Sequence, residues 1–205
     1  MRKIFPFELF HLGGDEVHTD CWNSTPHVKQ CFNTSALPTS IFDLLWNLYS
    51  NFYPVTLLIV TNWKCRLEDH NMNGTAAYQY FVLRAQEIAI SLNWTPVNWE
   101  ETFNTFATRL NPKTVVHNWL GSGVCPKAVA KGFRCIFSNQ GVWYLDHLDV
   151  PWESVYYAEP LEGITDASEQ KLVLGGEVCM WSETVDASNV QQTIWPRAAA
   201  AAGMF

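Results

Sequence analysis

Two carboxylic acids directly follow a pair of glycines near the start of the chain, in the sequence Gly13-Gly14-Asp15-Glu16. Residues 7–12 before them are mostly apolar and predict a short buried strand. The glycines allow a sharp turn or a close approach of the backbone to a ligand. The carboxyl groups are therefore expected at the carboxyl end of a strand, where α/β folds place their chemistry. A solvated acidic turn is the alternative interpretation of these four residues alone.

Tryptophan is unusually frequent, with ten residues in a chain of 205. Several of them, including Trp99, Trp119 and Trp181, lie near carboxylates or amides in segments that are expected to be strand ends or loops. The face of an indole ring binds the apolar face of a sugar, and its N–H group binds a polar partner. The pattern favours a sugar-stacking pocket over the alternative, in which these side chains only fill the core.

The elements that must position these side chains alternate between helix and strand, as in a parallel α/β domain. The clearest is a helix at residues 75–92, where apolar residues recur at intervals of three and four. The pattern also predicts helices at 101–110, 126–131 and 194–202, and strands at 96–99, 114–119, 133–137 and 172–174. Polar and aromatic residues follow one strand after another, which is how a (β/α)8 barrel builds its site. Only about five of the eight strands of such a barrel can be identified.

The residues around the carboxyl pair resemble the signature of glycoside hydrolase family 20, the β-N-acetylhexosaminidases. Further matches follow in the same order along the chain, at residues 97–101, 116–119, 143–146, 175–183 and 195–198. Together they cover residues 5–30 and 67–202, and they look closest to plant members. The resemblance implies that residues 1–205 form an incomplete catalytic domain. Its expected fold is a partial (β/α)8 TIM barrel of roughly the last five β/α units, without the opening strands and the N-terminal domain.

Residues 31–66 interrupt this resemblance and are interpreted as an atypical apolar insertion. Within them, residues 44–63 carry no charge and are about long enough to span a bilayer. Pro54 and several asparagines argue against a membrane segment. A retained intron is the favoured explanation, and a genuine insertion and a membrane anchor are the alternatives.

Cleavage of a glycoside needs a proton for the leaving oxygen and a nucleophile for the anomeric carbon. Most glycosidases supply both from two carboxyl groups, about 5 to 10 Å apart on opposite sides of the bond. Neighbouring residues in an extended segment point in different directions, so Asp15 and Glu16 are poorly placed to flank one bond. The resemblance implies that the nucleophile is instead the 2-acetamido carbonyl of the substrate, a known exception to the two-carboxylate rule.

The matching positions of the family imply a role for each catalytic residue. Glu16 is expected to be the general acid and later the base that activates water. Asp15 is expected to orient the acetamido N–H group and to stabilise the developing cation, while Tyr144 binds the acetamido oxygen. The expected substrate-binding residues are Trp99, Trp119, Asp146, Trp181 and Glu183. The residues expected to support the site without touching substrate are His11, Glu100, Glu101 and Glu177, whereas His117 is interpreted as an ordinary strand histidine.

The implied function is removal of terminal nonreducing N-acetylglucosamine or N-acetylgalactosamine by a retaining mechanism, without a cofactor. The alternative is an inactive fragment that acts as a sugar-binding or interaction module. The expected partners are glycans or oligosaccharides that end in an N-acetylhexosamine, and a homodimer as in the full-length family is left open. A net charge of -7 argues against nucleic acid, whose backbone requires Lys and Arg.

The family resemblance implies a secretory location in the vacuole, the apoplast or the extracellular space. Four Asn-x-Ser/Thr sequons agree with it, and they begin at Asn23, Asn33, Asn73 and Asn93. No signal peptide is recognised before the first expected strand.

Cysteine and histidine give no signal for metal binding. The cysteines lack zinc-type spacing, and the set His11, Asp15, His18 and Asp20 matches no standard ligand frame, so no metal site is predicted. Cys125, Cys135 and Cys179 are expected to be small buried hydrophobic residues.

Overall fold

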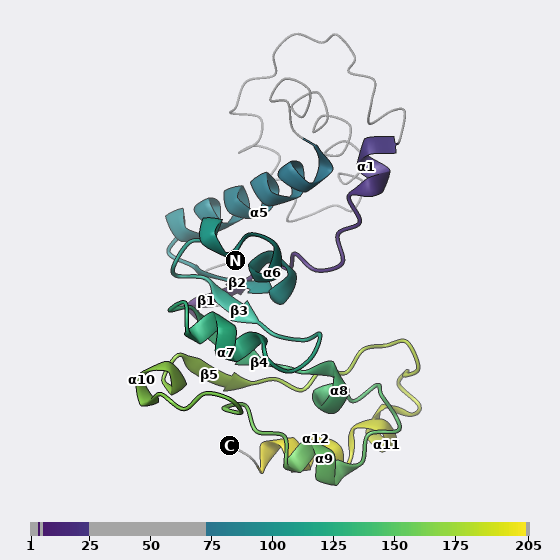
Figure 1. Ribbon diagram of the computed structural model, residues 1–205. Coiled ribbons are helices and arrows are strands. Elements are labelled where there is room, and N and C mark those ends of the chain that lie inside the picture. Colours follow the sequence, from purple (N-terminus) through teal and green to yellow (C-terminus); the bar gives the residue numbers. More distant parts are fainter. Residues whose placement is uncertain (1–3, 5, 25–72, 204–205) are drawn as a thin grey trace. The chain divides into compact units, whose positions relative to one another are not determined.

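The computed structural model describes residues 4, 6–24 and 73–203. These residues contain a sheet of five parallel strands that lie side by side in chain order (Figure 1). The strands are β1 (Leu9–His11), β2 (Thr95–Trp99), β3 (Val115–His117), β4 (Arg134–Phe137) and β5 (Val173–Gly176). The α/β class and the parallel sheet that the sequence predicts are confirmed.

The chain divides into two compact units. The first consists of residues 1–16 and 82–205 and holds the whole sheet, and the second consists of residues 17–81. In the second unit the structure describes α1 (Asp20–Ser24) and the first two turns of α5 (Gly74–Ser91). The expected insertion at residues 31–66 lies outside the described residues. Among the helices that are described, none is long and apolar enough to cross a bilayer.

The remaining helices connect the strands and form the C-terminal region. They are α6 (Glu100–Phe106), α7 (Val124–Val129), α8 (Gln140–Trp143), α9 (Trp152–Tyr156), α10 (Ala167–Gln170), α11 (Val190–Ile194) and α12 (Arg197–Ala202), with a 3-10 turn at Ala107–Arg109. After α7 the chain turns at Gly132, whose φ of 82° is typical of a glycine that ends a helix. The helices expected at 75–92, 101–110 and 126–131 are therefore present within a few residues.

The helix expected at residues 194–202 begins three residues later, and a separate helix that the sequence analysis did not predict precedes it. The helix α11 ends at Ile194, Trp195 is extended with a ψ of 142°, and α12 begins at Arg197. Proline has no N–H group to donate and disfavours the helical conformation in the residue before it. Pro196 therefore separates the two helices.

The first strand is less buried than its apolar sequence predicts. Phe7 is 74% exposed and Leu9 is 38% exposed, so the expectation of a buried strand is wrong for this segment. The physical reason is that β1 is an edge strand, paired only with β2 among the described residues. The opposite edge strand, β5, likewise exposes Leu174, which lies at an irregularity in its pairing with β4.

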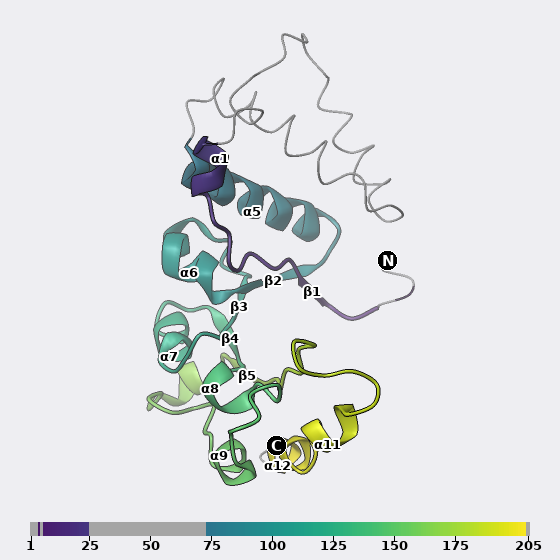
Figure 2. The same cartoon turned by 90° about the vertical axis from the view of Figure 1, so that its right-hand side faces the viewer.

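Successive side chains of a strand point to opposite faces of the sheet. On the face that α6 and α7 cover (Figure 2), Asn98 of β2 accepts a hydrogen bond from the buried Gln86 of α5. The neighbouring residue Trp99 points to the other face, where its ring stacks on His117 of β3 at 4.2 Å. The sheet thus has one face that binds helices and one that carries aromatic and imidazole rings.

A disulfide joins Cys125 of α7 to Cys135 of β4, with a Cα–Cα distance of 5.5 Å. The expectation that these two residues are unpaired hydrophobic side chains is therefore wrong. The helix and the strand are neighbours in the chain and pack together, which brings the two sulfur atoms within bonding distance. Cys179 remains a buried thiol, as expected, and lies 3.2 Å from the hydroxyl of Ser138.

Replacing both Cys125 and Cys135 with alanine is expected to lower the free energy of unfolding by about 3 kcal/mol. The bond spans 10 residues, and a loop of this size restricts the unfolded chain by roughly that amount. Urea unfolding with and without dithiothreitol measures the effect. The reductant should lower the midpoint of the wild-type chain and leave the double variant unchanged; equal midpoints throughout would contradict the prediction.

Gly176 at the end of β5 leaves room for the ring of Trp143, which is fully buried. A Cβ atom at this position would overlap that ring and lie 2.9 Å from the carbonyl oxygen of Phe137. We expect Gly176→Ala to cost about 3 kcal/mol of unfolding free energy, because a buried indole cannot move aside. Gly121→Ala is the matched control, since a Cβ there meets no atom within 4 Å. Thermal unfolding of both variants checks the difference, and similar midpoints would refute it.

Candidate active site

The turn after β1 carries the two adjacent carboxylic acids. Gly13 and Gly14 have φ angles of 68° and 100°, which glycine adopts without strain. The carbonyl oxygen of Gly13 accepts hydrogen bonds from the backbone N–H of Trp99 at 3.1 Å and from the side chain of Asn98 at 3.0 Å. The turn is therefore attached to the end of β2. We refer to residues 13–16 as the carboxylate turn.

Within the carboxylate turn the two acids differ in environment. Asp15 is half-buried and close enough to His11 to interact with it electrostatically. Glu16 is exposed and has a φ of 46°, in the left-handed region that is uncommon for residues other than glycine. The two side chains thus occupy different positions, as the sequence predicts for neighbours.

Four aromatic residues line up at or after the ends of four successive strands. They are Trp99 at the end of β2, Trp119 after β3, Tyr144 after β4 and Trp181 after β5. Their ring centroids are separated by 6.4 Å from Trp99 to Trp119, 6.2 Å from Trp119 to Tyr144 and 6.1 Å from Tyr144 to Trp181. We call these four residues the aromatic wall. Its members come from segments far apart in the sequence, and a continuous row of rings suits a sugar ligand.

Glu101 fixes the indole of Trp119 in the aromatic wall. Both of its oxygens accept the indole N–H of Trp119, at 2.9 and 3.0 Å. Burial raises the pKa of Glu101, its hydrogen bond with Trp119 lowers it, and the charges of Asp15 and Glu100 raise it. The turn meets the wall at Trp99, whose backbone N–H donates to the carbonyl oxygen of Gly13 at 3.1 Å and whose ring centroid lies 4.7 Å from that of His11. The sequence predicts a supporting role for Glu101 but not its bond to the indole.

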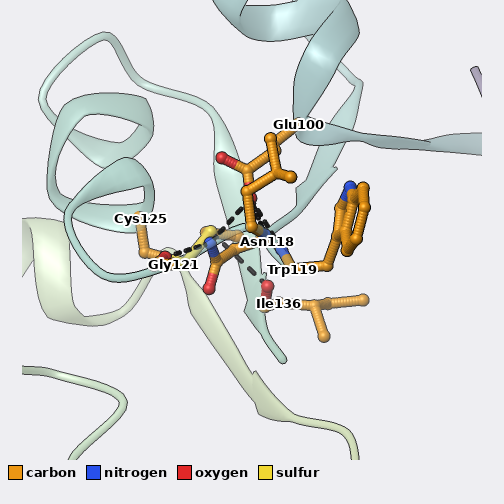
Figure 3. Close-up of a disulfide and its surroundings, with 8 residues drawn as sticks. Glu100, Asn118, Trp119, Gly121, Cys125 and Ile136 are labelled. Carbon is orange, nitrogen blue, oxygen red and sulfur yellow. Dashed lines mark hydrogen bonds between the residues drawn. A yellow bond between two sulfur atoms is a disulfide. The ribbon is translucent and has the colours of Figure 1, made fainter. Parts of the chain in front are cut away.

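Glu100 holds the loop that follows β3. Its carboxylate is 1% exposed and accepts the backbone N–H groups of Trp119 at 2.7 Å and Leu120 at 2.6 Å. The side chain of Asn118 donates to the same oxygen at 2.9 Å and to the carbonyl oxygen of Gly121 at 2.6 Å. In Figure 3 dashed lines join Glu100 to Asn118 and to Trp119. This network fixes the backbone from which Trp119 projects into the aromatic wall.

Tyr144 is fixed by pairing beyond the ends of β4 and β5. It forms a parallel bridge with Cys179, and the N–H of Leu145 donates to the carbonyl oxygen of Cys179 at 2.7 Å. The buried guanidinium of Arg197 in α12 donates to the carbonyl oxygens of Leu145 and His147. Burial and the nearby Cys179 raise the pKa of Tyr144, so its phenol stays protonated and can donate a hydrogen bond.

Asp146 and Glu183, the two acids predicted to bind substrate, lie on the loops that follow Tyr144 and Trp181 of the aromatic wall. The side chain of Asp146 is 12% exposed, and its Oδ1 atom is buried without a hydrogen-bond partner in the described part of the chain. Its Oδ2 atom lies 3.9 Å from Nε2 of His147. Glu183 is exposed on the loop after β5. The structure thus joins Trp99, Trp119, Tyr144 and Trp181 in one row, and the substrate contacts of Asp146 and Glu183 stay predictions.

A separate cavity of about 200 Å³ lies beside α7. Its lining includes Asn118, Cys125, Pro126 and Phe137. The Oδ1 atom of Asn118 is buried without a hydrogen-bond partner in the described residues. The cavity contains no member of the aromatic wall, and we assign it no part of the site. No cluster of three or more potential metal-binding side chains occurs within the described residues 4, 6–24 and 73–203.

Residues 1–205 match the model of the catalytic domain of glycosyl hydrolase family 20. The chain belongs to this family. It is 61% identical over 202 residues to β-hexosaminidase 1 of Arabidopsis thaliana and 50% identical over 200 residues to β-hexosaminidase 3 of the same plant. Each alignment covers 98% of this chain and 31% of the relative, so this family 20 chain spans about a third of the length of these curated relatives. The predicted family and its likeness to plant members are confirmed.

Solved structures of family 20 enzymes share the fold. A chitobiase of Flavobacterium johnsoniae is 26% identical with a TM-score of 0.65, and the match covers 98% of this chain and 26% of that one. An exo-β-N-acetylglucosaminidase of Vibrio harveyi, solved in complex with N-acetylglucosamine, has a TM-score of 0.72 at 19% identity, covering 98% and 28% of the two chains. At that identity the second likeness establishes the fold alone.

Proposed function

We propose that the chain is part of a β-N-acetylhexosaminidase, which removes terminal nonreducing N-acetylglucosamine or N-acetylgalactosamine with retention of configuration. In this proposal the five β/α units are the last units of a (β/α)8 barrel. The observation that carries it is that the carboxylate turn is hydrogen-bonded to the aromatic wall, through the backbone N–H of Trp99 and the carbonyl oxygen of Gly13 at 3.1 Å. Membership of family 20 and 61% identity to a plant β-hexosaminidase support the same function.

The proposed reaction begins with Glu16 as the acid. Its carboxyl proton passes to the glycosidic oxygen as the bond from that oxygen to the anomeric carbon breaks. The carbonyl oxygen of the substrate's acetamido group attacks the anomeric carbon from the other side and forms a cyclic oxazolinium ion. Glu16 then takes a proton from water, which opens the ring and restores the acetamido group. Each step replaces one bond at the anomeric carbon and inverts it, so two steps retain the configuration.

Three other groups hold the acetamido group for this attack. Asp15 accepts the acetamido N–H and balances the positive charge that develops on the ring. The phenol of Tyr144 stays protonated through burial, so it can donate to the acetamido oxygen and set its direction. The indoles of Trp99, Trp119 and Trp181 surround the apolar surfaces of the sugar. Asp146 and Glu183 accept sugar hydroxyls.

The proposed partners are oligosaccharides or glycans that end in an N-acetylhexosamine, and the proposed location is the secretory pathway. The disulfide between Cys125 and Cys135 supports this location, because disulfides form and persist in oxidising compartments. The sequon residue Asn93 is exposed on the turn after α5, where a glycan has room.

The test compares two chromogenic aryl β-glycosides that differ only at carbon 2 of the sugar. We expect the chain to hydrolyse the 2-acetamido sugar and to leave the 2-hydroxyl sugar intact, because only the former contains the internal nucleophile. Equal hydrolysis of both substrates would overturn the mechanism. Quenching of tryptophan fluorescence by N-acetylglucosamine without any hydrolysis would instead identify a sugar-binding module.

A further inference from the structure

Two histidines on the ring-bearing face of the sheet form a directed hydrogen-bonded pair. The backbone N–H of Gly13 donates to Nδ1 of His11 at 3.0 Å, so this nitrogen carries no proton. A neutral His11 then has its proton on Nε2, which lies 3.1 Å from Nδ1 of His117. Nδ1 of His117 must therefore accept, and the proton of His117 sits on Nε2. One backbone donor thus fixes the tautomers of both rings.

His117 is 1% exposed, and burial lowers its pKa to about 3. His11 lies on the edge strand β1 and is more exposed, and the partial desolvation of its ring lowers its pKa against the opposing effect of Asp15. The charged groups that face the pair are Asp15 of the carboxylate turn and Glu177 after β5, whose Oε2 atom lies 3.9 Å from Nε2 of His117. Trp99 of β2 covers both rings with an uncharged surface.

The N–H group and the carbonyl oxygen of Gly13 both form hydrogen bonds, and their partners lie on different strands. Its carbonyl oxygen binds Asn98 and Trp99 of β2, and its N–H binds His11 of β1. His117 of β3 fixes His11 from the other side. Asp15 and Glu16 follow two and three residues after Gly13, so a rotation of the His11 ring would move the turn that carries them.

We propose that His11 and His117 are positioning residues, a pair of fixed tautomers that holds the carboxylate turn in the geometry needed for the proposed glycosidase reaction. The proposal rests on the proposed function for its catalytic part. Its structural part depends only on two hydrogen bonds, in which Gly13 donates to His11 and His11 donates to His117. The sequence indicates an ordinary strand histidine at position 117, and the proposal adds a positioning role for it.

Nuclear magnetic resonance of the complete 15N-labelled chain tests the structural part. We expect the proton of both neutral rings on Nε2 at pH 7.5, and we expect the His117 ring to stay neutral down to about pH 5, because its burial opposes protonation. Spectra of His11→Gln and His117→Asn assign the signals. A proton on Nδ1 of His117, or a charged His117 ring at pH 5, would overturn the proposal.

The matched variants His117→Asn and His117→Leu test the positioning part. They are close in shape and both remove the stacking on Trp99, but only asparagine retains an acceptor near the position of Nδ1. We expect faster amide exchange at Gly13 in the leucine variant than in the asparagine variant. With an aryl N-acetylglucosaminide we expect kcat to be about 10²-fold lower in the leucine variant, with a similar KM, because the turn is misplaced.

The outcomes separate the proposal from the proposed function. If the wild-type chain hydrolyses the substrate and the two His117 variants exchange and react equally, the positioning role is wrong while the function stands. If the wild-type chain hydrolyses nothing, the proposed function fails. In that case the structural part of the proposal is supported if the tautomers and the amide exchange at Gly13 are as expected, and it is refuted if they are not.

Discussion

Replacing Glu16 with glutamine is expected to lower kcat for an aryl N-acetylglucosaminide by about 10²- to 10⁴-fold, which is the usual contribution of a general acid. The amide keeps the size of the side chain but has no acidic proton to give to the leaving oxygen. A dinitrophenyl leaving group departs without protonation, so its glycoside should lose much less in the bond-breaking step. Steady-state kinetics on two substrates with poor and good leaving groups measure this contrast.

The matched control for this variant is Glu153→Gln. Glu153 is an exposed residue of α9 and lies outside the carboxylate turn and the aromatic wall, so its replacement should leave both rates unchanged. A Glu16→Gln variant that retains wild-type kcat on the poor leaving group would remove Glu16 from the mechanism. A loss of equal size in kcat/KM on both substrates would indicate a damaged fold instead of a missing acid, because kcat/KM does not include the later step in which Glu16 acts as the base.

Replacing Glu100 with alanine should lower the free energy of unfolding by about 3 to 5 kcal/mol. The side chain is 1% exposed and accepts two backbone N–H groups and the amide of Asn118, and alanine would leave these buried donors without an acceptor. Urea denaturation measures the loss. Because the donors include the N–H of Trp119, the indole should also become more mobile, which fluorescence anisotropy detects.

Glu100→Gln separates the hydrogen bonds from the charge. Glutamine retains one acceptor oxygen for Asn118, Trp119 and Leu120. Its NH2 group replaces the oxygen that accepts from Nδ2 of Asn104 at 3.3 Å, so the Asn104 amide must turn to present its own oxygen. We expect this variant to lose less than about 1.5 kcal/mol, the net value of one ordinary hydrogen bond. Equal destabilisation by alanine and glutamine would show that the charge, and not the acceptor, holds the loop.

Much of the fold follows from local patterns in the sequence. The intervals of three and four in residues 75–92 predict α5, and the short apolar segments predict β2, β3 and β4 to within about two residues. The pattern misjudges places where another constraint dominates. Pro196 separates α11 from α12, and the edge position of β1 leaves apolar side chains exposed that an inner strand would bury.

The candidate site is predictable only in part. The sequence places aromatic and acidic residues after successive strands, and parallel pairing then brings Trp99, Trp119, Tyr144 and Trp181 into one row. The contacts that hold this row join residues that no local pattern links, because they depend on side-chain geometry across strands. His11 meets His117 across 106 positions, and Arg197 reaches the carbonyl oxygen of Leu145 across 52.

The disulfide between Cys125 and Cys135 is a different case. A cysteine directly before an expected helix, a glycine after that helix and a cysteine in the following expected strand are all visible in the sequence. Antiparallel packing of such a helix on its own strand brings the two residues close together, so this signal could have predicted the bond. The count of cysteines alone does not, because it says nothing about which residues face each other.

The central claim is that the acetamido group of the sugar attacks its own anomeric carbon. The most direct measurement is kcat/KM for aryl glycosides whose acetamido methyl group carries zero, one, two or three fluorine atoms. Fluorine withdraws electrons from the carbonyl oxygen and weakens it as a nucleophile, while the leaving group and the carboxylate turn stay the same. The account predicts a steep fall in kcat/KM with each added fluorine. A rate that does not depend on fluorine would mean that a group of the protein or water attacks instead, and it would contradict the account.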